Sequence, residues 1–156
     1  MDNTHRHQGT EDERLVLEHS IDADVSVAFA WKFRTDVTNW TDPPATFALN
    51  GAFTDGSQGS TTLPGQPPMI WWIRDVHAER SFAIEIPLDR ATLRFEWNLE
   101  AVTAGTKLTQ RILLSGANAT AYRQQVEMGF GPTLVDGMRR IAADMVAAER
   151  ASKNCG

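Results

Sequence analysis

The stretch ATLRFEWNLEAVTAGTKLTQRILLSG, residues 91–116, contains two alternating runs separated by the short segment TAG. Alternation of apolar and polar residues is typical of a strand with one buried face, and a short break with glycine is typical of a hairpin. When the hairpin is centred on the break, Phe95 lies opposite Ile112 on one face. Glu96 then lies opposite Arg111 on the other face, so this register predicts an apolar side and a charged side.

Two further runs, 69–76 and 81–87, precede this hairpin and extend the alternation. Short turns join them, so residues on antiparallel neighbours should lie directly opposite one another on the same face. The predicted cross-strand pairs are Ile73–Ile84, Trp71–Ile86, Phe82–Phe95 and Ile84–Leu93. One face of the predicted sheet is therefore almost continuously apolar, and Trp71 lies on it.

The opposite face carries Trp72 and a row of charged residues, Arg74, Glu85, Arg94, Glu96 and Arg111. We interpret this row as an outer ladder of cross-strand ion pairs, each of which contributes little free energy. An inverted register would turn the same row into an active site, and that alternative stays open. An exposed Trp72 would support a third alternative, a protein-interaction role through the outer face.

Helical periodicity occurs in two parts of the chain. Residues 22–44 begin with Asp24 as a candidate helix cap and lead into a second short turn that carries Trp40. From about residue 117 to near the end, an apolar stripe predicts one long helix, which Pro132 should kink or restart. The remaining strands are predicted at residues 14–21, 45–53 and 57–63.

A long antiparallel sheet with one apolar face must cover that face, and the terminal helix is the only large amphipathic cover in the sequence. We therefore predict an α+β fold, in which a curved antiparallel sheet of about seven strands wraps around a long C-terminal helix. Two short helices should follow the first strand. We expect a single domain over 14–150, after a disordered arm over 1–13 and before a tail over 151–156.

This order of elements resembles the helix-grip fold of the START and birch-pollen-allergen (SRPBCC) superfamily, and most of all its bacterial polyketide cyclase/dehydrase-type branch. The likeness is carried by WKFRTDVTNWTD (31–42), PPMIWWIRDVHAERSF (67–82), residues 91–116 and GMRRIAADMVAAE (137–149). The resemblance implies a cavity between the sheet and the terminal helix for a hydrophobic or aromatic small molecule. The superfamily includes lipid carriers, hormone receptors, co-chaperone domains and aromatic-ring cyclases, so the fold alone selects no reaction.

The bulk composition excludes several classes of protein. The 156 residues suit a single domain, and a net charge of −5 argues against a nucleic-acid-binding surface. The single cysteine, Cys155, excludes a disulfide framework and a cysteine metal cluster. No run approaches the roughly 18 apolar residues of a membrane span. The polar N-terminus lacks the apolar segment of a secretory signal, so we expect a cytoplasmic protein.

No motif in the sequence predicts a metal or a cofactor. His19 and His77 are isolated, and no spacing of His, Asp and Glu is typical of a metal site. Neither a Ser-His-acid grouping for acyl transfer nor a glycine-rich phosphate loop before a helix occurs. We therefore predict no metal and no cofactor.

Three polar residues are weak candidates for catalysis. Asp75 should lie on the apolar face opposite Phe82, or else cap the turn that follows its strand. Gln110, opposite Trp97, can orient a ligand carbonyl or hydroxyl, or else be a satisfied buried amide. Tyr122 extends the inward stripe of the helix and could donate a proton, or else keep its hydroxyl in water. The predicted ligand-binding residues are Trp40, Phe47, Trp71, Ile73, Ile84, Phe95, Trp97, Gln110, Tyr122, Phe130 and Met138.

Two functions follow from this site. The first is binding of a hydrophobic or aromatic small molecule, such as a lipid. The alternative is a polyketide cyclase/aromatase-like enzyme, a cyclase or dehydratase that folds a poly-ketone chain in the same cavity. A cyclase should carry several converging titratable groups, and the scattered candidates favour binding. We expect a hydrophobic small molecule as the partner, with no nucleic acid and no membrane span, and a homodimer stays open.

Overall fold

The sheet has seven strands in the order β1-β7-β6-β5-β4-β3-β2, and every pair of neighbours is antiparallel. The structure is a computed structural model that describes residues 13–40 and 45–155. Apart from Glu13, the predicted N-terminal arm lies outside the described residues. The elements in chain order are β1 (Arg14–Ala23), α3 (Val27–Arg34), η1 (Val37–Asn39), β2 (Thr46–Leu49), β3 (Gln58–Thr62), β4 (Met69–His77), β5 (Ser81–Leu88), β6 (Ala91–Val102), β7 (Gly105–Ser115) and α4 (Ala119–Cys155). The predicted α+β fold is confirmed.

The two short helices after β1 are held by side-chain caps. The hydroxyl of Ser26 accepts a hydrogen bond from the backbone N–H of Phe29 at 3.1 Å, so α3 begins after Ser26. The prediction that Asp24 is the cap is therefore wrong by two residues. Asp36 caps η1 in the same way, because its carboxylate accepts from the backbone N–H of Thr38 at 3.0 Å.

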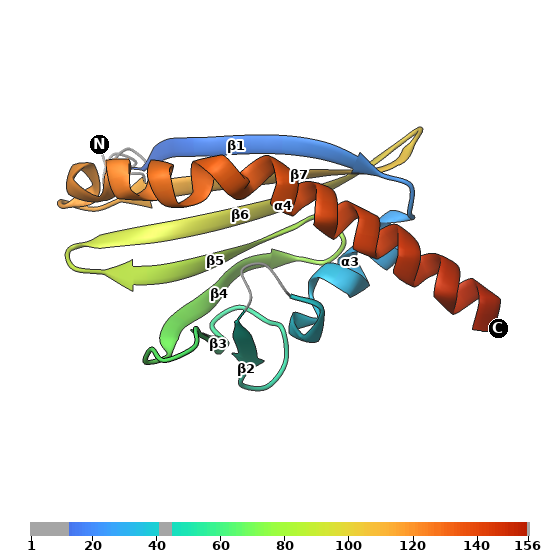
Figure 1. The fold of residues 1–156 in the computed structure, drawn as a ribbon, viewed down its shortest axis with the longest axis horizontal. Coiled ribbons are helices and arrows are strands. Elements are labelled where there is room, and N and C mark those ends of the chain that lie inside the picture. The colour runs from blue at the N-terminus through green and yellow to red at the C-terminus, as the bar shows by residue number, and fades with distance from the viewer. Residues whose placement is uncertain (1–12, 41–44, 156) are drawn as a thin grey trace, which may run out of the picture.

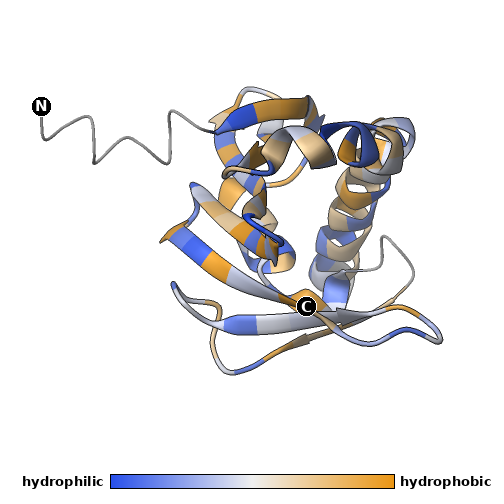
Figure 2. Cartoon of the chain, turned by 90° about the vertical axis from the view of Figure 1, so that its left-hand side faces the viewer, coloured by the Kyte–Doolittle hydropathy of each residue, from blue (hydrophilic) through white to orange (hydrophobic). Residues whose placement is uncertain are grey.

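The long helix α4 runs beside one edge of the sheet and extends beyond it (Figure 1). It packs chiefly against β1, with smaller contacts to β7 and α3. The helix continues through Pro132 without interruption, so of the two predicted effects, a kink or a restart, the restart is wrong. Seen end-on in Figure 2, the sheet curves round the side on which α4 lies. Side chains of α4 therefore reach the central strands from one margin of the concave face.

The register of the sheet follows the predicted pairs in most places. Ile73 pairs with Ile84, and Phe95 pairs with Ile112, as alternation predicted. The β5–β6 register is two residues off the prediction, because Phe82 pairs with Trp97 and Ile84 pairs with Phe95. The pairs Phe82–Phe95 and Ile84–Leu93 are therefore wrong.

The two-residue error arises at the turn between β5 and β6. Leu88 pairs with Ala91, so only Asp89 and Arg90 form the turn, and Arg90 has a φ of 56°. A non-glycine residue with positive φ allows this tight hairpin, and it leaves no sequence signal as clear as Asn-Gly. A shift of two residues returns each side chain to its own face, so the assignment of faces is unaffected.

No helix among the described residues combines the length and the apolar character that crossing a membrane requires. Within 13–40 and 45–155, no group of His, Cys, Asp and Glu side chains is placed to hold a metal ion.

Candidate ligand-binding site

The predicted pocket residues of β4, β5 and β6 share the concave, apolar face of the sheet. Trp71, Ile73, Ile84 and Trp97 belong to one buried cluster, and Met138 of α4 joins them at 1% exposure. Phe95 is half-buried and contacts both this cluster and a second one around Leu93. The structure therefore brings these residues together, and most of them are packed side chains.

The position of Trp71 depends on a glycine in the neighbouring strand β3. Gly59 lies directly opposite Trp71, and a Cβ at residue 59 would overlap the six-membered ring of the indole. The indole N–H of Trp71 donates to the hydroxyl of Thr61 at 2.9 Å. Gly59 thus provides the space for the ring, which is only 2% exposed. An isolated glycine inside a strand pattern is the sequence signal for such a close approach.

Aromatic rings from the residue after η1, from β2 and from the loop after β2 close this end of the concave face. The Trp40 ring lies 5.5 Å from the Trp71 ring, and it meets Phe47 and Phe53 edge-on at 5.7 and 6.5 Å. Phe53 in turn meets Phe82 edge-on at 5.0 Å. Edge-to-face pairs of this kind stabilise beyond their buried area. The predicted residues Trp40, Phe47 and Trp71 therefore form one continuous aromatic wall.

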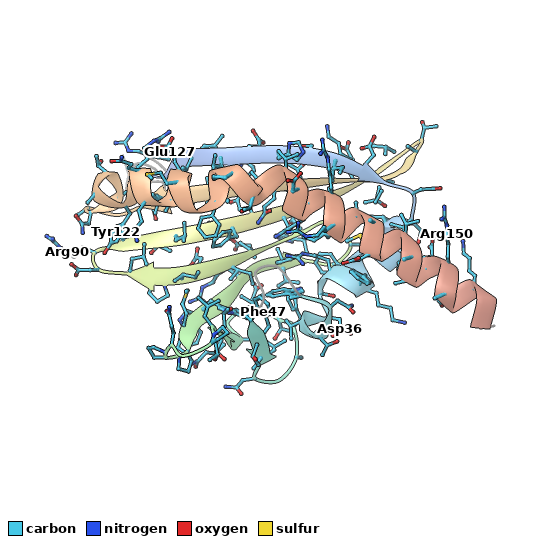
Figure 3. All side chains as sticks on the ribbon, in the orientation of Figure 1. Asp36, Phe47, Arg90, Tyr122, Glu127 and Arg150 are labelled. Atoms are coloured by element: carbon cyan, nitrogen blue, oxygen red, sulfur yellow. The ribbon has the colours of Figure 1, made fainter. Side chains whose placement is uncertain are left out.

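On the part of the concave face that lies under the first turns of α4, the apolar side chains are less fully buried. The Phe95 and Phe130 rings meet edge-on at 5.2 Å and join β6 to α4. Tyr122 packs into the same cluster, and Figure 3 shows it in the N-terminal part of α4, well apart from Phe47 at β2. The side chains here keep accessible surface: Ile86, Leu88, Phe95, Tyr122, Phe130 and Leu134 are all half-buried.

Two hollows of the structure lie over β2 and β3, and neither is lined by α4. An open one of about 560 Å³ lies between the start of β2 and the loop after β3. A smaller one of about 90 Å³ lies over β2, β3 and Ile70. An enclosed cavity between the sheet and α4 thus stays a prediction, and the half-buried side chains near Phe130 are where it would open.

Arg34 is a polar residue of this region that sequence reasoning missed. It is the last residue of α3, and its guanidinium carbon lies 4.2 Å from the Trp97 ring centroid and 5.0 Å from that of Trp40. The indole N–H of Trp40 donates to the Arg34 carbonyl oxygen at 2.8 Å. The helical stripe could continue at either Phe33 or Arg34, so periodicity alone did not show which side chain points inward.

A row of opposed residues crosses the concave face beside Arg34. Trp97 pairs with Gln110, as predicted, and Gln110 pairs with His19 of β1 on its other side. Gln110 and His19 are both half-buried. The pairing places the His19 imidazole and the Gln110 amide in one row with the Trp97 indole. The guanidinium of Arg34 stacks on that indole. Sequence reasoning treated His19 as isolated because the β1–β7 pairing joins residues 91 positions apart.

Asp75 does not lie on the apolar face, so its predicted position opposite Phe82 is wrong. The register shifts between Arg74 and His77, and Asp75 adopts a left-handed conformation with a φ of 53°. This bulge turns the carboxylate to the outer face, where it accepts from the guanidinium of Arg94 at 2.7 Å. The structure thus removes Asp75 from the candidates within the concave face.

The charged row lies on the outer face, and Arg94 is its centre. Arg94 donates to Glu96, Glu85 and Asp75 at 2.7–2.8 Å. Burial opposes its charge, but these carboxylates outweigh burial and raise the pKa of Arg94. Burial also raises the pKa of Glu13, which lies 3.9 Å from Arg94. The predicted pair of Glu96 and Arg111 is confirmed at 3.2 Å, so the row is an ion-pair network.

No protein-family model matches the sequence, and no curated protein does. Solved structures resemble the fold. The aromatase/cyclase ZhuI from Streptomyces sp. R1128 has a TM-score of 0.68 and 15% identity, over 90% of this chain and 98% of that one. The di-domain ARO/CYC StfQ from the steffimycin biosynthetic pathway has a TM-score of 0.63 and 13% identity, over 97% of this chain and 56% of StfQ. Ara h 8.0201 has a TM-score of 0.59 and 12% identity, over 86% of this chain and 99% of that one.

At these identities the similarity shows a shared architecture, and it does not show a shared activity. The matches cover 90% and 86% of a chain that consists of a seven-stranded antiparallel sheet, short helices after β1 and a long terminal helix. The chain therefore has a helix-grip fold, as the order of its elements in the sequence predicted.

Proposed function

We propose that the protein binds a hydrophobic or aromatic small molecule between the concave face of the sheet and α4. The observation that carries this proposal is the group of half-buried apolar side chains around Phe95, Phe130 and Tyr122. Ligand sites are concave and lined mainly by apolar and aromatic side chains, and these half-buried rings line a concave wall with surface that a ligand could cover. The helix-grip fold shared with aromatase/cyclases and Ara h 8.0201 supports the same conclusion.

The two ends of the concave face would have different roles in ligand binding. The packed rings of Trp40 and Trp71 form a fixed wall, while Phe95 and Phe130 offer surface that a ligand could cover. Burying about 200 Å² of apolar ligand surface would contribute roughly 5 kcal/mol before the entropy cost of association. Micromolar binding corresponds to about 8 kcal/mol, so a ligand that binds that tightly must bury well over roughly 300 Å² of apolar surface or add polar contacts.

A direct test measures binding of the fluorescent apolar probe N-phenyl-1-naphthylamine. The protein should bind it with a micromolar or lower Kd, and Phe130→Trp should weaken binding because the larger ring occupies the accessible space. Met128→Trp is the matched control, since Met128 lies two residues away on α4 and is 68% exposed. Mass spectrometry under native conditions would identify a ligand that copurifies. A wild-type protein that binds neither the probe nor any small molecule would contradict the proposal.

An aromatase/cyclase-like reaction is the second candidate. It is favoured by the fold shared with ZhuI and StfQ and by the polar side chains of His19, Gln110 and Arg34 beside Trp97. Such a reaction would form a carbon–carbon bond within a poly-ketone chain and then release water. The test is mass spectrometry of a poly-β-ketone thioester analogue after incubation. Loss of one water with the wild type, but not with Gln110→Leu, would support catalysis over simple binding.

A further inference from the structure

We infer that Gln110 and His19 select a ligand that carries a hydroxyl group and reject a hydrocarbon of the same shape. This inference rests on the proposed binding function and deepens it by naming the ligand class, a hydroxylated aromatic molecule. The two side chains come from β7 and β1, and the residues lie directly opposite each other in the sheet.

The pair of Gln110 and His19 interrupts an otherwise apolar part of the concave face. Together with Trp97 the two residues form one row across three strands. The rows on either side are apolar, with Phe95, Ile112 and Leu17 in one and Leu99, Leu108 and Ile21 in the other. Polar groups among apolar side chains cost free energy unless they are hydrogen-bonded. An amide and an imidazole in this row therefore call for partners.

The protein itself does not supply these partners. Within 13–40 and 45–155, no group forms a hydrogen bond with the side chain of Gln110 or of His19. Both side chains are half-buried, and none of their polar atoms is sealed from solvent. The amide and the imidazole can therefore bond to water or to a bound molecule.

The polar residues around this pair have internal partners instead. Ser20 and Thr109 are the next opposed pair along the same two strands, and a hydrogen bond of 2.7 Å joins their hydroxyl oxygens. Thr106 points to the same side of β7 as Gln110 and is fully buried, and its hydroxyl donates to the Val25 carbonyl oxygen at 2.8 Å. The lack of an internal partner thus distinguishes Gln110 and His19 from the polar residues beside them.

A ligand that covers this row decides whether the two side chains keep hydrogen-bond partners. A hydrocarbon would remove water from the amide and the imidazole without replacing it, and a polar group buried in this way weakens binding about tenfold or more. A hydroxyl group both donates and accepts, so it can bond to one atom of Gln110 and one of His19. A site built to hydrogen-bond a hydroxyl discriminates strongly against the analogue that lacks it.

The apolar body of such a ligand would lie over Phe95 and Phe130. Adjacent rows on one face are two residues apart along a strand, a distance of about 7 Å. A body of two fused rings spans that separation. Its hydroxyl would then reach the row of Gln110 while its rings cover the half-buried side chain of Phe95, which meets Phe130 edge-on.

The test compares 2-naphthol with 2-methylnaphthalene, which share the ring body and differ by a hydroxyl against a methyl group. Both compete with N-phenyl-1-naphthylamine, and 2-naphthol should displace it from the wild type at a concentration about tenfold lower. Gln110→Leu replaces the amide by an apolar group of similar size and should reverse the order. Asn98→Leu is the matched control, because Asn98 carries an exposed amide on the outer face of β6. This control should keep the wild-type order.

The outcomes separate the two claims. If 2-methylnaphthalene displaces the probe from the wild type at an equal or lower concentration, the inference is overturned while the proposed function stands. An unchanged preference for 2-naphthol in both Gln110→Leu and His19→Phe also overturns it. Failure of the wild type to bind the probe and both compounds overturns the proposed function itself. The wild-type comparison needs no variant, so a folding defect in Gln110→Leu leaves its result intact.

Discussion

Gly59 and Trp71 face each other across the β3–β4 pair, and the indole occupies the space that a side chain at residue 59 would need. Gly59→Ala should therefore displace the Trp71 ring from its buried position and lower the free energy of unfolding by about 1–3 kcal/mol. Urea denaturation measures this change. Gly129→Ala is the control, because nothing lies within 4 Å of a Cβ there and a helical alanine should stabilise by up to about 1 kcal/mol. Equal effects of the two substitutions would contradict the packing argument.

The adjacent tryptophans should respond very differently to truncation. Trp71→Ala removes a ring that is 2% exposed and leaves a large cavity, so we expect a loss of roughly 3–5 kcal/mol in unfolding free energy. Trp72→Ala removes a half-buried ring on the outer face whose contact with Arg74 contributes about 0.5–1 kcal/mol. Thermal unfolding of both variants makes the comparison. A larger effect at Trp72 would mean that the sheet presents the opposite face to the core.

Arg94 should be the most important charge for stability. Its side chain is 15% exposed and holds three carboxylates at hydrogen-bond distance, so Arg94→Met leaves them close together without a cation between them. Because the carboxylates are partly solvated, we expect a loss of about 2–3 kcal/mol at pH 7, less than for a fully buried pair. Arg111→Met, with a more exposed side chain, should cost under about 1 kcal/mol.

The raised pKa of Glu13 predicts in which direction the stability of the fold changes with pH. Burial raises the pKa of this carboxyl above its ordinary 4.5, so the folded state binds the proton more tightly than the unfolded state does. The charged carboxylate therefore destabilises the fold at pH 7, and this cost disappears as the pH falls through the raised pKa to below 4.5. Glu13→Gln should be more stable than the wild type at pH 7 and equal to it at pH 4. Denaturation curves at the two values check this, and an advantage that grows at low pH would contradict it.

The sequence allowed the two faces of the sheet to be predicted because alternation is a property of each strand alone. Ile73, Ile84, Phe95 and Trp97 all fell on the apolar face, and the outer ladder was assigned correctly. The position of Asp75 could not be predicted, because its left-handed conformation breaks the alternation without a glycine to signal it.

The polar part of the candidate site depends on contacts between distant parts of the chain. Arg34 stacks on Trp97 across 63 positions, and His19 meets Gln110 only through the β1–β7 pairing. Neither contact is encoded in a local pattern, so periodicity identified the apolar wall and missed the polar residues set into it. Gln110 was found because the short β6–β7 turn fixes its partner Trp97.

The turn of Asp89 and Arg90 has a consequence for how this chain tolerates changes of length. Adding two residues to one strand beside the turn would return every later side chain to its original face. Adding one residue would exchange the aromatic wall with the ion-pair ladder along the whole of that strand. We therefore expect natural insertions and deletions within β5 and β6 to come in even numbers, with odd ones confined to loops or absorbed by a bulge such as the one at Asp75.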